Sequence, residues 1–192
     1  MRVAVRFAGA ALLLGGALSV WGGCAATGPV PVVPAPSGRA VPSAYVIPGV
    51  PFLPQEEDTC GPSSLAMLLR FHGKDVTTGE LVRETRTAGL QGTLITDLAA
   101  ASRRRGVPAE VADLDMPGLR ERIARGQPVI LLVDLGIWAW SRPHYLLAYG
   151  VTPDGVVANS GETEGKVIPY GTLEGEWAKM GHLAIVVPGG GK

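Results

Sequence analysis

The most informative stretch of this chain is residues 51–69, which read PFLPQEEDTCGPSSLAMLL. Its leucines recur at helical spacing, as at Leu65 and Leu68, and Pro62 suits the first turn of a helix. The pattern predicts a helix whose N-terminus lies at Cys60. Unpaired backbone N–H groups and the positive end of a helix dipole favour a thiolate at such a position. We therefore expect Cys60 to have a lowered pKa and to act as a nucleophile.

A buried, unreactive core cysteine is the alternative interpretation of Cys60, because cores commonly hold free cysteines. The polar run from Glu56 to Thr59 directly precedes it, which is a poor position for a core residue. The chain has only one other cysteine, Cys24. Two cysteines exclude a disulfide framework, so the domain must be stabilised by an apolar core.

Helical patterns continue beyond residue 69. Thr77 and Glu80 have the spacing of a capping box, which predicts a second helix. Thr93 is a candidate cap for a third helix. Asp115, followed by Pro117, can open a fourth.

From Pro128 onward the pattern changes from helices to strands, with β-branched and aromatic residues between turn signals. Helices followed by an antiparallel sheet predict a single α+β domain over residues 45–188, with a short tail at 189–192. The expected strands are residues 129–135, 144–151, 156–158, 167–168 and 183–187, with a further edge strand at 108–112.

A thiolate nucleophile needs a general base, and the chain has three histidines. His144 opens an apolar strand after a stretch with two tryptophans, a position where a site would be built. His72 lies at the predicted C-terminal end of the Cys60 helix, where it suits the helix dipole. His182 precedes the last strand and has the character of a turn residue, although it stays an alternative base.

Three features together resemble the bacteriocin-processing cysteine peptidases that remove double-glycine leaders. They are Gln55, the Cys-Gly-Pro run at 60–62 with its leucine-rich helix, and the Pro-His-Tyr run at 143–145 on a strand. The similarity covers about residues 50–187, and more narrowly it is to the stand-alone, lipoprotein-type members of that group. It implies a papain-like fold with an N-terminal helical half and a C-terminal antiparallel sheet.

The resemblance also implies roles for individual residues. Cys60 would be the nucleophile, His144 the base and Gln55 the side-chain donor of the oxyanion hole. The family usually has an Asp that orients the imidazole, but here the region after the strand hairpin reads VVANSG, residues 156–161. Asn159 or Ser160 must then supply this group, and Asn159 is preferred because its side-chain oxygen can accept from the ring N–H.

Two further residues are candidates for the substrate cleft. Trp138 and Trp140 precede His144 and could form a cleft wall, although core packing or a partner surface explains them equally well. Asp154 lies in a Pro-Asp-Gly turn and is explained by turn chemistry. No phosphate loop or metal-ligand spacing is present in the sequence, so we expect no metal and no cofactor.

The N-terminus predicts export. Arg2 and Arg6 precede an apolar stretch that is too short to span a bilayer, which is typical of a signal peptide over residues 1–23. Small residues before Cys24 resemble the lipobox of bacterial lipoproteins, in which this cysteine is lipidated. A Pro-rich spacer follows to residue 44. By the same resemblance, Ala25 after the cysteine directs the protein to the outer membrane, facing the periplasm.

Composition narrows the choice of function. Acidic and basic residues number 17 each, and no basic stripe is interleaved with aromatics, which argues against nucleic acid as a partner. The sequence therefore predicts an envelope cysteine peptidase that acts on peptides through a thioester intermediate. Two alternatives remain: a cysteine acyltransferase or amidase, and a non-catalytic peptide-binding lipoprotein on a degenerate peptidase fold. The oligomeric state is open.

Overall fold

A computed structural model describes residues 42–56, 58–87, 89 and 92–189. The predicted signal peptide, the lipidation site Cys24 and most of the predicted spacer lie outside these residues. No helix in the described part of the chain is long and apolar enough to cross a membrane.

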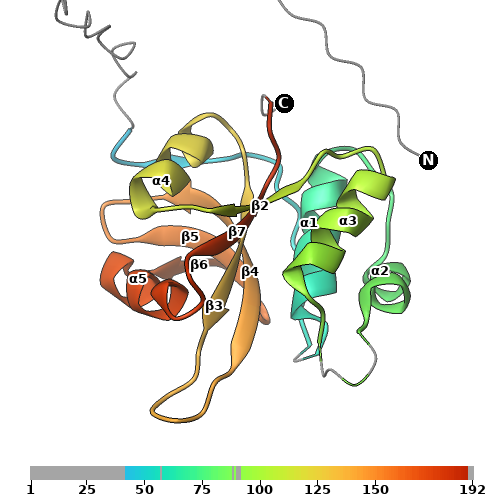
Figure 1. The fold of residues 1–192 in the computed structure, drawn as a ribbon. Helices are drawn as coiled ribbons and strands as arrows, with labels where there is room; N and C mark the ends of the chain where they lie inside the picture. The colour runs from blue at the N-terminus through green and yellow to red at the C-terminus, as the bar shows by residue number, and fades with distance from the viewer. Residues whose placement is uncertain (1–41, 57, 88, 90–91, 190–192) are drawn as a thin grey trace, which may run out of the picture. The chain divides into compact units, whose positions relative to one another are not determined.

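The described residues form a seven-stranded antiparallel sheet at the centre of the domain (Figure 1). The strand order is β2-β7-β3-β4-β5-β6, and β1 pairs with the far end of β4. The predicted edge strand is confirmed as β2, which pairs with β7. The strands are β1 (Tyr45–Val46), β2 (Glu110–Asp113), β3 (Val129–Asp134), β4 (Pro143–Val151), β5 (Val156–Ser160), β6 (Thr163–Ile168) and β7 (Leu183–Val186).

Helices cover both faces of this sheet (Figure 1). One face carries α1 (Cys60–Phe71), α2 (Thr78–Thr85) and α3 (Ile95–Arg104), and the other carries α4 (Met116–Ala124) and α5 (Tyr170–Ala178). The prediction of an α+β domain is confirmed. The two halves are less separate than expected, because α5 is inserted between the last two strands.

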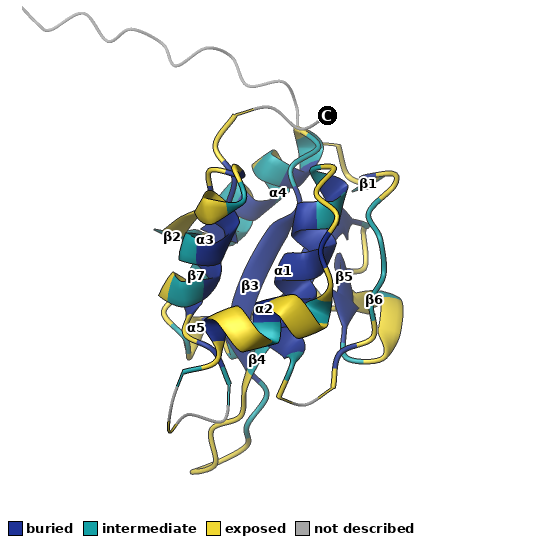
Figure 2. Cartoon of the chain, turned by 90° about the vertical axis from the view of Figure 1, so that its right-hand side faces the viewer, coloured by how far each residue is buried: buried dark blue, intermediate teal, exposed yellow. Residues whose placement is uncertain are grey.

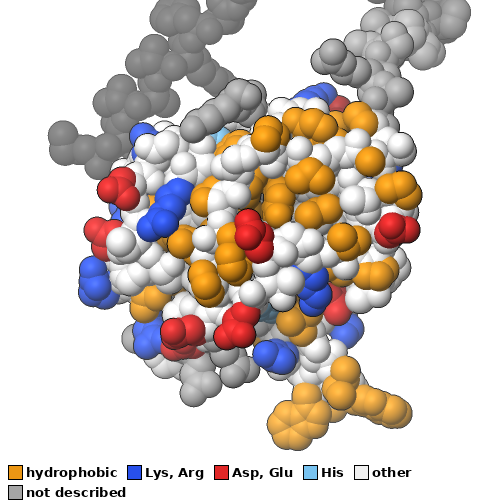
Figure 3. Space-filling model, turned by 180° about the vertical axis from the view of Figure 1, so that it is seen from behind, with side chains coloured by type: hydrophobic (Ala, Val, Ile, Leu, Met, Phe, Trp, Pro, Cys, Tyr) orange, Lys and Arg blue, Asp and Glu red, His pale blue; other side chains and the backbone are white. Residues whose placement is uncertain are grey.

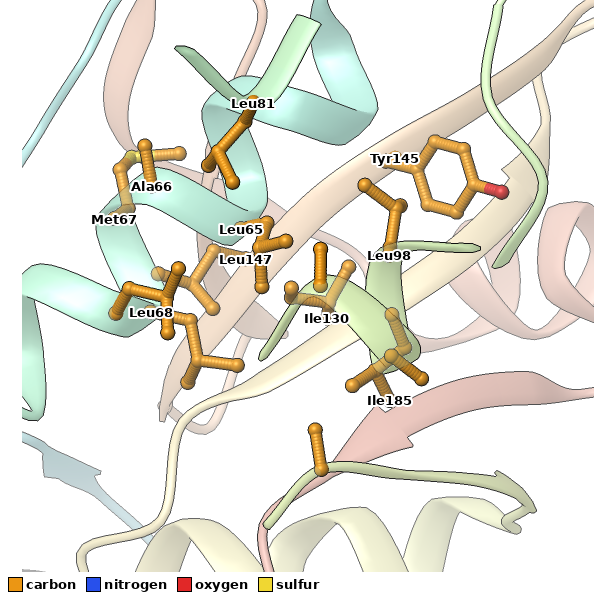
Figure 4. Close-up of a cluster of buried hydrophobic side chains, with 14 of the residues drawn as sticks. Leu65, Ala66, Met67, Leu68, Leu81, Leu98, Ile130, Tyr145, Leu147 and Ile185 are labelled. Carbon is orange, nitrogen blue, oxygen red and sulfur yellow. The ribbon is translucent and has the colours of Figure 1, made fainter. Parts of the chain in front are cut away.

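The helix α1 is the centre of the first core (Figure 2). Its residues from Leu65 to Leu69 are fully buried, because α2 and α3 cover the side that does not face the sheet. Figure 4 shows leucines of α1 packed with Leu98 of α3 and with Ile130 and Leu147 of the sheet. A second core fills the opposite face. The described residues of both cores lie between Ile47 and Val187.

Local sequence signals account for most helix starts. The Thr77–Glu80 capping box is present in full, and the Asp115 side chain accepts from the Gly118 N–H group at the start of α4. The prediction for Thr93 is wrong: α3 begins after Leu94 without a side-chain cap, and the Thr93 hydroxyl faces inward.

The sequence pattern missed α5. Two glycines within it lower its helix propensity, and Pro169 at its N-cap has no capping side chain. The helix is held instead by Leu173 and Trp177, which lie one turn apart and are fully buried against the sheet. Tertiary packing therefore outweighs propensity here.

Candidate active site

Cys60 is the first residue of α1, as the sequence predicts. It is a free cysteine, only 9% exposed, and its thiol receives hydrogen bonds from backbone N–H groups that include Tyr145 of β4. Burial nevertheless raises the pKa of the Cys60 thiol above its ordinary value, and these N–H groups offset only part of the effect. The expectation of a lowered pKa is therefore wrong, because burial outweighs the helix start.

The packing of α1 on β4 places the backbone of His144 beside Cys60. His144 is the residue before Tyr145, whose backbone N–H contacts the thiol. Its Nε2 atom lies 3.1 Å from the Oγ atom of Ser160 on the neighbouring strand β5. Because Ser160 occupies Nε2, Nδ1 is the ring nitrogen that this contact leaves open.

The environment keeps the His144 imidazole neutral. Burial, followed by the positive charges of Arg142 and Lys166, lowers the pKa of His144 from 6.5 to about 4. Ser160 carries no charge, so it does not stabilise the imidazolium as a carboxylate would. At neutral pH the resting site therefore holds a thiol and a neutral imidazole, and not an ion pair.

Asn159, preferred from the sequence as the residue that orients His144, hydrogen-bonds other groups in the described structure. Asn159 is fully buried, and its Nδ2 atom donates to the Pro51 carbonyl at 3.1 Å while its Oδ1 atom accepts from the Gly165 N–H at 3.1 Å. Both ends of its amide are thus used to hold loops together. Ser160, the alternative, is the residue that contacts the imidazole.

Gln55 lies in the loop before α1 and is 5% exposed. Its Oε1 atom accepts from the Gly161 N–H at 2.7 Å, which fixes which end of the amide carries the nitrogen. Its Nε2 atom donates to Ser64 Oγ at 2.7 Å, but lies 3.4 Å from the Cys60 carbonyl oxygen, long for a hydrogen bond. One N–H of the amide therefore makes a short hydrogen bond to Ser64. The other points to the start of α1, where its only contact within the described residues is the long one to the Cys60 carbonyl.

Ser64 and Gly161 were not singled out from the sequence. Ser64 lies four residues after Cys60, so it is on the same face of α1, and this spacing could have drawn attention to it. Gly161 also exchanges a backbone bond with Gln55, whose N–H donates to the Gly161 carbonyl at 3.0 Å. The adjacent residues Ser160 and Gly161 therefore position His144 and Gln55 together.

A cleft of about 1240 Å³ lies over these groups. Gln55 and His144 both line it, whereas Cys60, which is 9% exposed, is not one of its lining residues. Its charged lining is mixed, with three arginines and three acidic residues, and one pair, Arg86 and Asp58, forms a salt bridge. The lining residues are Gln55, Glu56, Asp58, Val82, Arg83, Arg86, Thr87, Gly89, Ser141, Arg142, Pro143, His144, Gly161 and Glu162.

Trp138 and Trp140 do not form a wall of this cleft. Ser141 and Arg142 of the same loop line it, but the two tryptophan side chains are 102% and 81% exposed. The described structure therefore gives their predicted role in the cleft no support. They project into solvent.

The other two histidines are placed away from the thiol. His72 caps the C-terminal end of α1, a twelve-residue helix, and so lies roughly 18 Å along the axis from Cys60. His182 bonds Glu174 at 2.8 Å and packs edge-on against Trp177 of α5, on the opposite face of the sheet. His144 is the histidine that the fold brings to Cys60.

Comparison with known proteins agrees with this geometry. The family model described as "Peptidase C39 family" matches residues 51–187, which span the thiol helix, His144 and the last strand. The chain belongs to the peptidase C39 family. It therefore contains a cysteine-peptidase-like domain with the papain-like fold of that family.

Solved structures of C39-like domains share this fold. A putative C39-like peptidase from Bacillus anthracis is 18% identical with a TM-score of 0.63, covering 78% of this chain and 99% of its own. The peptidase domain of Streptococcus ComA, a bifunctional ABC transporter, is 21% identical with a TM-score of 0.59, covering 73% and 99%. A double-glycine-motif protease from an AMS/PCAT transporter, solved with its leader peptide, is 18% identical with a TM-score of 0.58, covering 73% and 92%. No curated protein matches the chain.

Proposed function

We propose that this C39 domain is an active cysteine peptidase in which Cys60 is the nucleophile, His144 the general base, Ser160 the residue that orients His144, and Gln55 an oxyanion donor. The observation that carries the proposal is the pair of bonds made by Ser160 and Gly161. They hold the imidazole and the Gln55 amide in the lining of one cleft, and Tyr145, the residue after His144, contacts the only cysteine that the structure describes.

The proposed reaction starts from a neutral pair. As Sγ of Cys60 attacks the peptide carbonyl carbon, the thiol proton passes to Nδ1 of His144. The carbonyl oxygen becomes an oxyanion, which the weakly used N–H of Gln55 and a backbone N–H at the start of α1 stabilise. The imidazolium then donates the proton to the amine as the C–N bond breaks. Water, deprotonated by His144, hydrolyses the thioester and restores the thiol.

Ser160 has a defined part in these steps. Its hydroxyl oxygen accepts from Nε2–H, which holds the tautomer in which Nδ1 is free to take a proton. It supplies a dipole where an Asp would supply a charge, so the imidazolium is less stabilised. We infer a slower but still productive site.

Peptides are the proposed substrates. One structural neighbour is a double-glycine-motif protease bound to a leader peptide, which supports a substrate segment with small residues at the cleavage site. The predicted signal peptide and lipidated Cys24 support a location in the cell envelope, anchored to the outer membrane and facing the periplasm. Mass spectrometry of the protein purified from membranes tests that anchor: an intact, unmodified residue 24 would contradict it.

A second candidate is a non-catalytic peptide-binding domain on the same fold. Two observations favour it: Ser160 is uncharged, and burial raises the pKa of Cys60. Such a protein would keep the cleft and bind peptides without cleaving them. Variants of Cys60 would then bind peptides as the natural protein does.

Hydrolysis of a diverse peptide pool, followed by mass spectrometry, separates the two candidates. We expect new peptide ends with the natural protein and none with Cys60→Ala or His144→Ala. Equilibrium binding of the same pool to Cys60→Ala is the matched experiment. Binding without cleavage by the natural protein would overturn the peptidase proposal in favour of the binding domain.

A further inference from the structure

The loop between β3 and β4, residues 135–142, carries three large apolar side chains that are highly exposed. Ile137 is 72% exposed, Trp138 102% and Trp140 81%. They are the most exposed of the large hydrophobic residues that the structure describes. Figure 3 shows a hydrophobic projection that stands out from the outline of the domain. We call Ile137, Trp138 and Trp140 the apolar tip.

The base of this loop is firmly built. Asp134, the last residue of β3, accepts from the backbone N–H groups of Gly136 and Arg142, both at 2.7 Å, and from the Ser141 hydroxyl at 2.9 Å. Lys179 of α5 donates to the Gly136 carbonyl at 2.8 Å. These bonds close the loop below the tip, so its shape does not depend on what the tip contacts.

The backbone of the tip is specialised as well. Gly136 approaches the Trp140 carbonyl so closely that a Cβ atom there would lie 1.8 Å from the oxygen. Trp138 has a φ of 58°, in the left-handed region that residues with a side chain rarely adopt. The hydrogen bonds at the base of the loop and the uncommon backbone conformation at its tip turn three large apolar side chains outward. This arrangement points to a function for their exposure.

The shape and chemistry of the tip indicate what it contacts. The tip projects from the domain, so it suits a partner that can deform to surround it. Tryptophan places an apolar ring and a polar N–H at one site, which suits the boundary between lipid headgroups and acyl chains. Cations stand at the base of the tip, at Lys179 and Arg142, where they would meet anionic headgroups.

The length of the chain before the domain is compatible with such a contact. Seventeen residues, 25–41, separate the predicted lipid site Cys24 from Pro42. An extended Pro-rich segment of this length spans roughly 50 Å. The described chain enters beside the far end of β4, nine residues and about 30 Å from the tip. A lipid anchor and the tip can therefore reach the same bilayer.

We propose that Ile137, Trp138 and Trp140 insert into the headgroup region of a phospholipid membrane. The tip gives the domain a second, non-covalent membrane contact. Since Ser141, Arg142 and His144 line the cleft at the base of the same loop, insertion holds the mouth of the cleft close to the membrane surface.

Tryptophan fluorescence tests the proposal directly. The chain from Pro42 has three tryptophans, and Trp177 is fully buried, so a change on membrane contact reports Trp138 and Trp140. We expect vesicles of phosphatidylethanolamine and phosphatidylglycerol to shift the emission to the blue, to protect it from an aqueous quencher, and to sediment with the protein. In Trp138→Ser/Trp140→Ser, partitioning onto vesicles should fall by about tenfold or more.

Two controls make the outcome decisive. Val167→Thr removes apolar surface from β6, where Val167 is 45% exposed, and should leave vesicle binding unchanged. The double variant should melt at the same temperature as the natural domain, because both tryptophans are highly exposed. The proposal is overturned if the natural domain does not bind vesicles, if the double variant binds equally well, or if the tip instead mediates dimers seen by sedimentation without vesicle binding.

Discussion

The Nε2 atom of His144 lies 3.1 Å from the hydroxyl oxygen of Ser160 on the neighbouring strand. Burial, with the charges of Arg142 and Lys166, lowers the His144 pKa to about 4, and the Ser160 hydroxyl has no charge that would raise it. The chemistry of the site follows from that value. At neutral pH the His144 imidazole is unprotonated and can accept a proton. The Cys60 thiol does not lose its proton without a base.

Ser160→Ala should weaken catalysis without removing it. The variant loses the acceptor of the Nε2 proton, so the imidazole can turn or adopt the wrong tautomer. We expect kcat/KM for a cleaved peptide to fall by roughly tenfold to a hundredfold. An unchanged kcat/KM would show that Ser160 does not position His144.

Ser160→Asp should raise the pKa of His144. A carboxylate near Nε2 stabilises the imidazolium, which typically changes a pKa by about one to three units. The titration of the His144 ring, followed by NMR, should therefore move upward from a midpoint of about 4. A midpoint that stays near 4 would mean that the residue at position 160 does not face the ring.

Asn159→Ala should act on stability and leave the imidazole unaffected. The change removes hydrogen bonds to Pro51, Gly165 and the Met67 sulfur from a fully buried position, and leaves the Pro51 carbonyl and the Gly165 N–H unsatisfied. We expect the free energy of unfolding to fall by about 2–4 kcal/mol. The His144 titration should be the same as in the natural protein. A changed His144 midpoint with little loss of stability would restore the original assignment of Asn159.

The pH dependence of stability tests the low pKa of His144. The folded pKa is about 4 and the unfolded value about 6.5, so between them the unfolded chain binds more protons and stability falls as pH falls. We expect a loss of about 2 kcal/mol between pH 7 and pH 5 from this residue. A comparison of denaturant unfolding between the natural protein and His144→Gln isolates the contribution of His144. Equal slopes in the two proteins over this range would contradict the low pKa.

Ser64→Ala tests how Gln55 is held. The variant removes the acceptor at 2.7 Å that fixes the Gln55 amide, so the proposed oxyanion donor becomes mobile. We expect kcat to fall by roughly tenfold with little change in KM. Ser63→Ala is the matched control, because Ser63 is its buried neighbour and its hydroxyl has no hydrogen-bond partner within the described structure. Equal effects of the two changes would leave Ser64 with a packing role alone.

Much of the fold could be predicted from the sequence because its signals are local. The start of α1 at Cys60, the Thr77 capping box and the Asp115 cap depend on residues within one helical turn. The edge strand β2 also follows from its own pattern. In contrast, α5 depends on Leu173 and Trp177 finding a place in a core formed by distant strands, which no local pattern reveals.

The site was less predictable, since it depends on strand register. β5 has an irregularity between Ala158 and Ser160 in its pairing with β6, and β4 has one between Ala148 and Gly150. A bulge changes which side chains share a face, so alternation along VVANSG cannot distinguish Asn159 from Ser160. The raised pKa of Cys60 was missed for a related reason: it depends on how closely α1 packs against β4.

The most direct test of the account is capture of Cys60 by a peptide aldehyde that ends in Gly-glycinal, labelled with ¹³C at the aldehyde carbon. A hemithioacetal needs the thiol, a proton acceptor and oxyanion stabilisation together. We expect NMR to show this adduct on the natural protein, and its affinity to fall by about tenfold or more in both His144→Ala and Gln55→Ala. No adduct on the natural protein, or equal affinity in the variants, would contradict the claim that Cys60, His144 and Gln55 form one catalytic site.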